Sequence, residues 1–250
     1  MNAKARQDRI LEILDSKGYV TVKYLIGELE YSSATVNRDL NALERRQLVI
    51  RSYGGVEPVR TKYVPIPFRS HKMHLVKRSI GREAAAMVQD GDTVYIDSST
   101  TAQYMEQYLT QKRDLTVITN NIILAANLSA HDVKVICLGG TVVEAPCMLC
   151  GAETVENAAR YRVDKMFFAT SAVSENGLIS SGLYDLVFRT ISENADKVFY
   201  LVDHEKVGQP FHAVYCDFSA VDCVISDHNF SAETKKRYPG TEFITVSEFN

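Results

Sequence analysis

The sequence predicts a two-domain α/β protein, in which a small helical amino-terminal domain precedes a larger domain built on a mainly parallel sheet. The chain has 250 residues, and because domains average roughly 150 residues, two domains of unequal size fit this length. The first third of the chain is basic and the rest is acidic. The hydrophobic pattern also changes, from short helical repeats to an alternation of helix and strand patterns from Ser79 onward.

Composition and segment lengths are those of a globular protein. Hydrophobic residues make up 46% of the chain and charged residues 24%, which excludes a disordered, collagen-like or coiled-coil chain. No stretch approaches the roughly 20 apolar residues that cross a bilayer, and the amino terminus is charged where a signal peptide is apolar. We therefore expect a cytoplasmic location and no membrane contact. The odd, scattered cysteines indicate free thiols: Cys137, Cys147, Cys150, Cys216 and Cys223.

The net charge of −3 hides an asymmetry along the chain. Residues 1–78 hold 15 Lys and Arg against 8 Asp and Glu, whereas the remaining residues hold 13 against 23. A basic segment joined to an acidic body predicts that the first binds a polyanion. Nucleic acid is the obvious polyanion, and an acidic protein surface is the alternative.

Three short helices and a hairpin account for the basic segment. Apolar residues recur there at helical spacing, and capping residues separate the three runs: Ile10, Ile13 and Leu14; Val22, Leu25, Ile26 and Leu29; Val36, Leu40 and Leu43. After them Leu48–Arg51 alternates weakly, and Gly54–Gly55 can turn a hairpin. These elements predict a winged helix-turn-helix over residues 1–58.

The third helix has an apolar back and a polar front that suits the major groove of DNA. The amino-terminal residues of such a helix contact base edges, while arginines near its end and in the wing contact phosphates. The candidates are Ser33, Ala34, Thr35, Asn37, Arg38, Asn41, Arg45, Arg51 and Tyr53. The alternative is the ordinary polar face of a three-helix bundle, but the coincidence of turn, caps, wing and positive charge favours DNA binding.

Residues 59–78 are predicted to connect the two domains. Pro65 and Pro67 block a helix and favour an extended path, and basic residues flank them. These charges either approach DNA phosphates or form a solvated linker, and the sequence leaves both alternatives open. His71 and His74 have helical spacing but no third ligand in view, so we expect no metal site.

The acidic body, residues 79–250, alternates helix and strand patterns. Its strands are apolar on both faces, which indicates a mainly parallel sheet covered by helices on each side. Strands are expected at residues 93–97, 115–119, 133–138, 165–169, 198–202 and 221–225, and helices at 80–88, 101–109, 122–128 and 186–194. Ligands of such sheets bind beyond the carboxyl ends of the strands.

Polar residues follow several of these strands, and the richest group is Asp97–Thr101. Its hydroxyls precede a predicted helix, so hydroxyl groups, backbone N–H groups and the positive helix terminus together suit a phosphate. The alternative is an ordinary helix N-cap with spare serines. Thr119–Asn121, Gly139–Gly140 and Asp203–Gly208 are expected on the same edge of the sheet.

Residues 32–56, SSATVNRDLNALERRQLVIRSYGGV, span the third predicted helix and the wing. They resemble the DNA-binding signature of DeoR-family bacterial transcriptional regulators, which consists of a serine, a T-I-R-R-D-L core, an L-E pair and a wing ending near H-G-G. Asn37 stands in place of the first arginine of that core. Tyr53 stands where a histidine is common, and both departures fall at positions expected to face DNA.

The body resembles the same family over nearly its whole length. Residues 97–101 are similar to the family's D-x-G-T-T loop, with Ser99 replacing the glycine, and residues 203–208 to its D-x-S-K-F-G, with Glu205 replacing a small residue. The resemblance implies a fold similar to sugar-phosphate isomerases such as ribose-5-phosphate isomerase, and a phosphorylated sugar as ligand. The implied effector site comprises Asp97, Ser98, Ser99, Thr100, Thr101, Asn120, Gly140, Asp203 and Lys206.

The resemblance and the residue patterns predict a repressor of a sugar-metabolism operon, controlled by a phosphorylated sugar. The expected partners are operator DNA, the sugar phosphate and further copies of the chain in a dimer or tetramer, because paired half-sites suit twofold proteins. We expect no cofactor and no enzymatic turnover. One alternative is a sugar-phosphate isomerase using Asp185, Asp203 and Lys206. Another treats the amino-terminal domain as a protein-interaction module.

Overall fold

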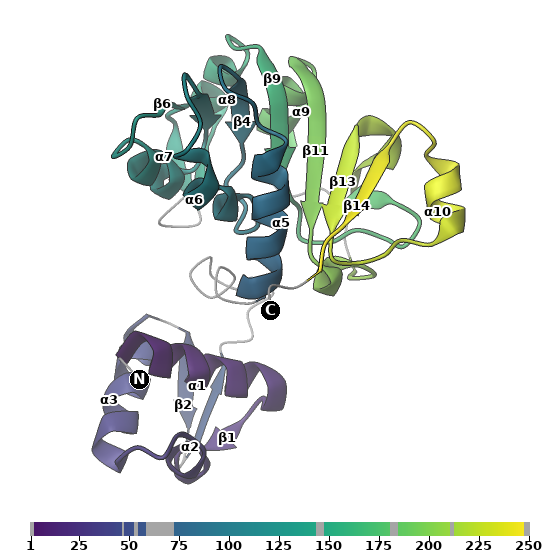
Figure 1. The fold of residues 1–250 in the computed structure, drawn as a ribbon. Helices are drawn as coiled ribbons and strands as arrows, with labels where there is room; N and C mark the ends of the chain where they lie inside the picture. The colour runs from purple at the N-terminus through teal and green to yellow at the C-terminus, as the bar shows by residue number, and fades with distance from the viewer. Residues whose placement is uncertain are drawn as a thin grey trace. The chain divides into compact units, whose positions relative to one another are not determined.

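The computed structural model describes residues 3–46, 48–52, 55–58, 73–143, 148–180, 185–210 and 213–247. It divides into two compact units, Met1–Lys72 and Met73–Asn250, which we call the small unit and the sheet unit. Figure 1 shows the small unit in purple and the sheet unit in blue to yellow. Tyr53 and Cys147 lie outside the described residues.

The small unit packs three helices against a three-stranded antiparallel sheet. The helices are α1 (Ala3–Lys17), α2 (Val22–Leu29) and α3 (Ser33–Arg45), and the strands are β1 (Val20–Thr21), β2 (Val49–Ser52) and β3 (Gly55–Pro58). The strand order is β1-β3-β2, and β3 residue Val56 pairs with Val20 on one side and Arg51 on the other. One buried cluster of α1, α2 and α3 side chains fills the interior. The predicted winged helix-turn-helix is thereby confirmed.

Side-chain caps fix where the second and third helices begin. Thr21 Oγ1 accepts a hydrogen bond from the Tyr24 backbone N–H (3.1 Å), and Ser32 Oγ accepts one from that of Thr35 (3.3 Å). Such caps satisfy helix donors that have no partner within the helix. Both caps are hydroxyl residues between the helical runs, where the sequence pattern predicts capping residues.

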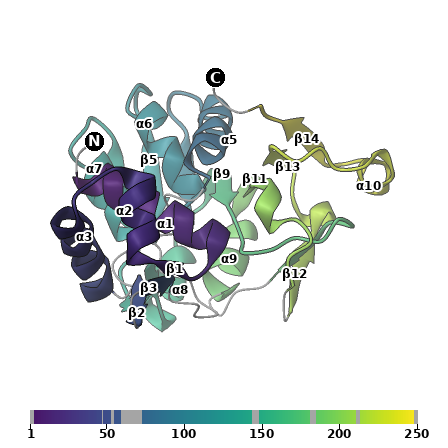
Figure 2. The same cartoon turned by 90° about the horizontal axis from the view of Figure 1, so that it is seen from below.

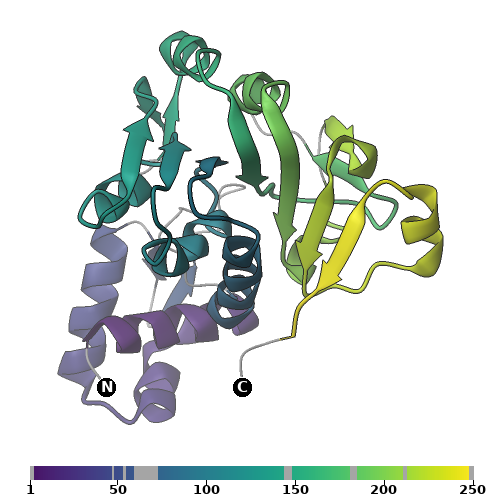
Figure 3. The same ribbon diagram turned by 45° about the horizontal axis from the view of Figure 1, so that its top comes forward.

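Seven strands form the central sheet of the sheet unit, in the order β14-β13-β11-β9-β4-β5-β6. Neighbouring strands in this order pair in parallel, and Figure 3 shows the green and yellow strands side by side. The strands are β4 (Thr93–Ile96), β5 (Thr116–Thr119), β6 (Lys134–Cys137), β9 (Val163–Phe168), β11 (Ala195–Val202), β13 (Cys223–Ser226) and β14 (Glu242–Thr245). The predicted parallel α/β fold is confirmed.

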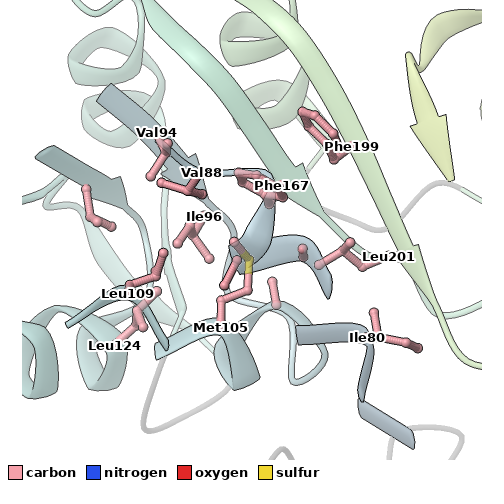
Figure 4. Close-up of a cluster of buried hydrophobic side chains, with 14 of the residues drawn as sticks. Ile80, Val88, Val94, Ile96, Met105, Leu109, Leu124, Phe167, Phe199 and Leu201 are labelled. Atoms are coloured by element: carbon pink, nitrogen blue, oxygen red, sulfur yellow. The ribbon is translucent and has the colours of Figure 1, made fainter. Parts of the chain in front are cut away.

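Helices cover both faces of this sheet, as Figure 2 shows. One face packs against α5 (His74–Ala86), η1 (Ala102–Met105), α6 (Glu106–Leu109) and α7 (Ile122–Leu128). The other packs against α8 (Ala152–Ala158) and α9 (Asp185–Ser192). Adjacent strand residues point to opposite faces, so Phe167 belongs to the first core and Phe168 to the second. Figure 4 shows the first core, with Ile80 of α5 near Leu201 of β11.

Short elements surround the sheet, and the sequence pattern did not reveal them. Two antiparallel pairs join β7 (Thr141–Val143) to β8 (Met148–Cys150) and β10 (Leu178–Ser180) to β12 (Val214–Asp217). The single-turn helices η2 (His204–Lys206) and η3 (Phe218–Ala220), and the short helix α10 (Ala232–Arg237), complete the unit. The edge strand β14 of the central sheet and the helix α8 were also absent from the predicted elements.

Two predicted boundaries need correction. The first helix of the sheet unit, predicted at residues 80–88, spans His74–Ala86, because Val76 and Lys77, which look like linker residues in the sequence, are buried. The helix expected at 101–109 is a four-residue 3-10 turn, η1, followed by the single α-turn α6. Within the described residues, every helix is too short or too polar to cross a bilayer.

Candidate functional site

The front of α3 carries the residues predicted to contact DNA. Ser33, Ala34, Arg38, Asn41 and Arg45 are exposed, and Thr35 and Asn37 are half-buried. The opposite side of the helix carries the fully buried side chains Val36, Leu40 and Leu43. The polar front therefore faces solvent, as a helix that enters a DNA groove requires.

A buried ion pair, which the sequence pattern did not reveal, anchors α3 to α1. Asp39 is 1% exposed and accepts hydrogen bonds from Arg6 Nε and from Arg6 Nη2 (3.2 Å). Gln7 Nε2 also donates to Asp39 (3.3 Å). The sequence did contain a signal for this ion pair. Asp39 lies beside Leu40 on the apolar back of the helix, where an unpaired charge is costly, so a cationic partner could have been expected.

The front of α3 is tied to the wing through one arginine. Arg51 Nη1 donates to Asn41 Oδ1 and Arg51 Nη2 donates to Asn37 Oδ1, each at 2.6 Å. Asn37 Nδ2 in turn donates to the Ser33 carbonyl oxygen (2.9 Å). Arg45 Nε donates to the Asn41 carbonyl oxygen (3.3 Å). Three predicted DNA contacts, Asn37, Asn41 and Arg51, thus form one hydrogen-bonded group.

In the sheet unit, Asp97 organises the turn that follows β4. Its carboxylate accepts hydrogen bonds from Ser99 N (3.0 Å), Ser99 Oγ (2.5 Å) and Ala169 N (3.1 Å). Burial of the carboxylate raises the pKa of Asp97 to about 6, although these hydrogen bonds and the charge of Lys206 oppose the rise. Ser98 and Ser99 are half-buried beside it.

Two lysines from different elements reach the end of the same turn. Lys77 of α5 is 3% exposed, and its Nζ donates to Thr100 Oγ1 (3.2 Å). Lys206 of η2 donates to Thr101 Oγ1 (3.1 Å). Two positive charges thus converge on adjacent threonine hydroxyls at the carboxyl edge of the sheet.

The sequence singled out Lys206 but not Lys77 as part of this site. Lys77 lies one turn before Gly81 and about two turns before Ala84, both of which are buried. This spacing places the lysine on the apolar face of α5. The helical spacing of Lys77 with these buried residues was therefore the missed signal. It was overlooked because the neighbouring basic residues made Lys77 look like part of a charged linker.

Asp203 supports Lys206 from the end of β11. The carboxylate is 2% exposed, and its Oδ2 lies 3.4 Å from Lys206 Nζ. That oxygen makes no hydrogen bond within the described part of the chain. A buried carboxylate oxygen is costly to leave without a donor, and the ion pair with Lys206 compensates its charge.

Asn120 and Gly140 serve the packing of this edge. Asn120 Oδ1 accepts from the Tyr95 hydroxyl (3.0 Å), and its Nδ2 donates to the Leu149 carbonyl oxygen (3.2 Å). Both ends of the amide are thereby engaged inside the protein. Gly140 has φ +117°, and a Cβ there would lie 2.0 Å from Thr154 Oγ1. Only glycine fits this position.

The sequence predicts that the N-terminus of a helix after Asp97–Thr101 helps to bind a phosphate, but in the described part of the chain the helix found there, η1, has no free N-terminal donors for this role. Ser99 already occupies the first donors of η1, because its Oγ accepts from Ala102 N (3.1 Å) and its carbonyl oxygen from Gln103 N (3.2 Å). The turn is also too short to have a substantial dipole. Positive charge at this edge comes from the lysines instead.

A winged helix-turn-helix with a polar, solvent-facing recognition helix, followed by a parallel α/β unit with two lysines and two carboxylates around one turn at its carboxyl edge, is typical of a ligand-responsive transcription regulator. Comparison with known families agrees with this class. Residues 6–62 match the DeoR-like helix-turn-helix domain, and residues 72–228 match the DeoR C terminal sensor domain. The chain belongs to the DeoR family.

Characterised relatives extend over nearly the whole chain. The HTH-type transcriptional repressor GlcR of Bacillus subtilis (strain 168) is 32% identical over 91% of this chain and 89% of its own length. The glycerol-3-phosphate regulon repressor of Escherichia coli (strain K12) is 29% identical over 91% and 92%. The lactose phosphotransferase system repressor of Staphylococcus aureus (strain N315) is 28% identical over 95% and 98%.

Solved structures with weaker similarity include ribose 5-phosphate isomerase A from Methanocaldococcus jannaschii. It is 17% identical, with a TM-score of 0.40, over 54% of this chain and 55% of that one. The eIF2B beta structure from Chaetomium thermophilum is 18% identical, with a TM-score of 0.45, over 76% of this chain and 53% of that one. Similarities of this size carry no argument about function.

Proposed function

We propose that this protein is a transcriptional repressor of a sugar-metabolism operon, in which the small unit binds operator DNA and the sheet unit binds a phosphorylated sugar that changes the affinity for DNA. Membership of the DeoR family and the repressor functions of its relatives support this proposal. The exposed front of α3 supports the DNA half of it.

The observation that carries the effector half is the convergence of Lys77 and Lys206 on Thr100 and Thr101. Holding an ammonium group away from water is costly unless a negative charge or strong acceptors compensate it. A phosphate group supplies three acceptor oxygens and up to two negative charges. A phosphate bound at Thr100 and Thr101 would accept charge-assisted hydrogen bonds from both ammonium groups, in addition to the partners that each lysine already has.

The remaining residues of this edge then have distinct roles. Asp203 orients Lys206 through their ion pair, and its second function is to accept a sugar hydroxyl at Oδ2. Asp97, Ser98 and Ser99 shape the turn and line the sugar side of the site. Asn120 acts through packing, since its amide is already bonded at both ends.

Control of DNA binding follows if the ligand favours one of two conformations of the chain. The coupling needed is typically 1–3 kcal/mol, or roughly 5- to 150-fold in DNA affinity. Lys77 lies in the first turn of α5, the helix that directly follows the segment between the two units. A ligand that binds Lys77 therefore acts on the part of the sheet unit nearest in sequence to the small unit.

Thermal unfolding of the purified chain with a panel of phosphorylated sugars and their unphosphorylated counterparts tests the proposal. A ligand that binds only the folded chain raises the melting temperature by mass action. We expect stabilisation by phosphorylated members only, lost in Lys77→Gln and Lys206→Gln. Lys134→Gln, an exposed lysine at the start of β6 on the opposite edge, should retain it. Stabilisation that survives both site substitutions would refute the site.

The DNA half is tested by selecting binding sequences from a random DNA pool and measuring how the stabilising sugar changes the affinity for them. A defined motif, steep salt dependence and a change in affinity with the sugar are expected. Absence of a motif would refute operator binding. The same preparations should not turn over the sugar phosphate, whereas turnover abolished by Lys206→Gln would support the isomerase alternative.

Assembly and location follow from this role. Operators read by helix-turn-helix proteins commonly contain two half-sites about 34–36 Å apart, so we propose a homo-oligomer, a dimer or a tetramer, that acts in the cytoplasm where operator DNA lies. Light scattering of the purified chain measures the assembly. A monomer at the concentrations that occupy DNA would contradict it.

A further inference from the structure

The wing residue Arg51 lies over the front of α3. Along β2, alternate residues point to the same face, so Arg51 shares the face of Val49, which is buried against the helices. Its backbone is held opposite Val56, at the centre of the small sheet. The arginine is half-buried, and its side chain is therefore directed toward α3 by the strand that carries it.

The guanidinium group of Arg51 spans one turn of the recognition helix. Two different nitrogens donate to Asn37 Oδ1 and Asn41 Oδ1, at 2.6 Å each. Residues four apart on a helix lie one above the other, so one planar group bonds both amides at once. The ammonium group of a lysine could not reproduce this fork.

These bonds fix which way the Asn37 amide points. A guanidinium only donates hydrogen bonds, so it must face the oxygen of the amide. The amide nitrogen then donates to the carbonyl oxygen of Ser33 (2.9 Å) and to Ser33 Oγ (3.2 Å). Because both ends of Asn37 are held, it cannot offer the donor and acceptor pair by which asparagine reads adenine.

Asn41 is held at its oxygen only. It is exposed, and its Nδ2 makes no hydrogen bond with the described residues. With Oδ1 bonded to Arg51, the amide presents a fixed N–H donor on the front of α3. A donor of fixed direction discriminates between bases, because the acceptors in the major groove differ from one base pair to the next.

We propose that Arg51 is a positioning residue for sequence recognition, because it fixes the side-chain amides of Asn37 and Asn41. Asn41 then presents an N–H donor to base acceptors, whereas Asn37 reads no base. This inference deepens the proposed function and rests on it. It replaces the role of phosphate contact that the sequence suggests for Arg51.

The test compares Arg51→Lys with Arg9→Lys, a charge-preserving control in α1, where Arg9 pairs with Glu12. Each chain is assayed for the motif it selects from random DNA, for its affinity for that motif and for unrelated DNA, and for salt dependence. Side-chain amide NMR signals of Asn37 and Asn41 are recorded without DNA. Circular dichroism melting checks that each variant is folded.

For Arg51→Lys we expect a roughly 5- to 150-fold fall in the ratio of specific to non-specific affinity, the value of one good base contact, with non-specific binding and salt slope unchanged. Both amide signals should shift. Asn37→Ala should cost little more in the Arg51→Lys background, since the residues act as one unit. Arg9→Lys should change none of these quantities.

Other results overturn the inference. A phosphate contact predicts that Arg51→Lys keeps the motif, and that Arg51→Ala weakens specific and non-specific binding equally and lowers the salt slope by about 0.9. Unchanged amide signals in Arg51→Lys would refute the positioning role even without any DNA measurement. If the wild-type chain selects no motif, the proposed function fails, and the amide signals alone decide whether Arg51 holds the two asparagines.

Discussion

Replacing Gly81 with alanine tests how closely α5 must approach η1, the short 3-10 helix that follows Thr101. A Cβ at Gly81 would lie 2.7 Å from the backbone carbonyl carbon of Tyr104 and 2.8 Å from its Cβ. Carbon atoms in ordinary contact are about 3.5 Å apart, so α5 or η1 must move by roughly 0.8 Å. The obstacle is largely backbone, which cannot rotate away.

Two opposing effects set the magnitude. Alanine is favoured over glycine inside a helix by about 1 kcal/mol, whereas forcing extra volume into a packed interface costs about 1–3 kcal/mol. The net change is a loss of about 0–2 kcal/mol in the unfolding free energy of the sheet unit. At about 2–4 °C per kcal/mol for a domain of this size, the melting temperature falls by up to about 8 °C.

Gly27→Ala in α2 is the matched control, since nothing lies within 4 Å of its added Cβ. It keeps the helix gain of about 1 kcal/mol and should raise the melting temperature of the small unit. Scanning calorimetry of the full chain measures both transitions.

Gly81→Ala should also weaken binding of the stabilising sugar phosphate. Gly81 lies one turn from Lys77, so a shift of α5 or η1 displaces the backbone that carries Lys77 relative to Thr100, whose Oγ1 lies 3.2 Å from Lys77 Nζ. If Gly81→Ala instead stabilises the sheet unit as Gly27→Ala stabilises the small one, and the ligand still binds, then α5 does not approach η1 closely.

Three further predictions concern single residues. The pKa of Asp97, about 6 when folded, exceeds the ordinary value of 3.8 for an aspartate, so the wild type should lose up to about 3 kcal/mol relative to Asp97→Asn between pH 4 and 7, measured by urea unfolding. The loss occurs as pH rises, because the folded state holds the proton more tightly. Asp39→Ala should abolish the cooperative melting of the small unit by leaving Arg6 buried without its partner, whereas replacing both residues by Leu and Met should largely restore it. Gly140→Ala should cost about 2–4 kcal/mol from a positive φ and a clash with Thr154, and Gly91→Ala, with φ +85° and open space, only about 1–2 kcal/mol.

The sequence predicted most of the architecture because its long elements carry clear periods. The recognition helix shows apolar residues at Val36, Leu40 and Leu43 and a capping serine at its start, and the structure has each where the pattern indicates. Parallel strands such as β11 are apolar on both faces and easy to identify. The ribbons β7–β8 and β10–β12 and the edge strand β14 were not predicted. Length alone does not explain this, because the four-residue strands β4 and β5 were recognised as apolar runs.

The sequence predicted a site residue only where that residue directly follows a recognisable strand or lies on a recognisable helix. Asp97 and Asp203 could be assigned to one edge because the carboxyl ends of parallel strands meet there. Contacts between elements distant in sequence carry no local signal. Lys77 looked like linker charge, and only the packing of α5 beside η1 brings it to Thr100.

The arrangement of the two lysines explains why one small anion could act on the whole sheet unit. Lys77 belongs to the first helix of the unit and Lys206 to the turn after its fifth sheet strand, and both bond to the hydroxyls of a third segment. A phosphate bound there would connect all three through charge-assisted hydrogen bonds, which are roughly twice as strong as neutral ones. The ligand would therefore favour whichever conformation holds α5 against the turn. The ligand then alters DNA affinity only if the two conformations differ both in their affinity for the ligand and in their affinity for DNA. Lys77→Gln should consequently reduce both the affinity for the ligand and the maximal effect of the ligand on DNA binding. A substitution that lowers only the affinity should still show the full effect at a higher ligand concentration.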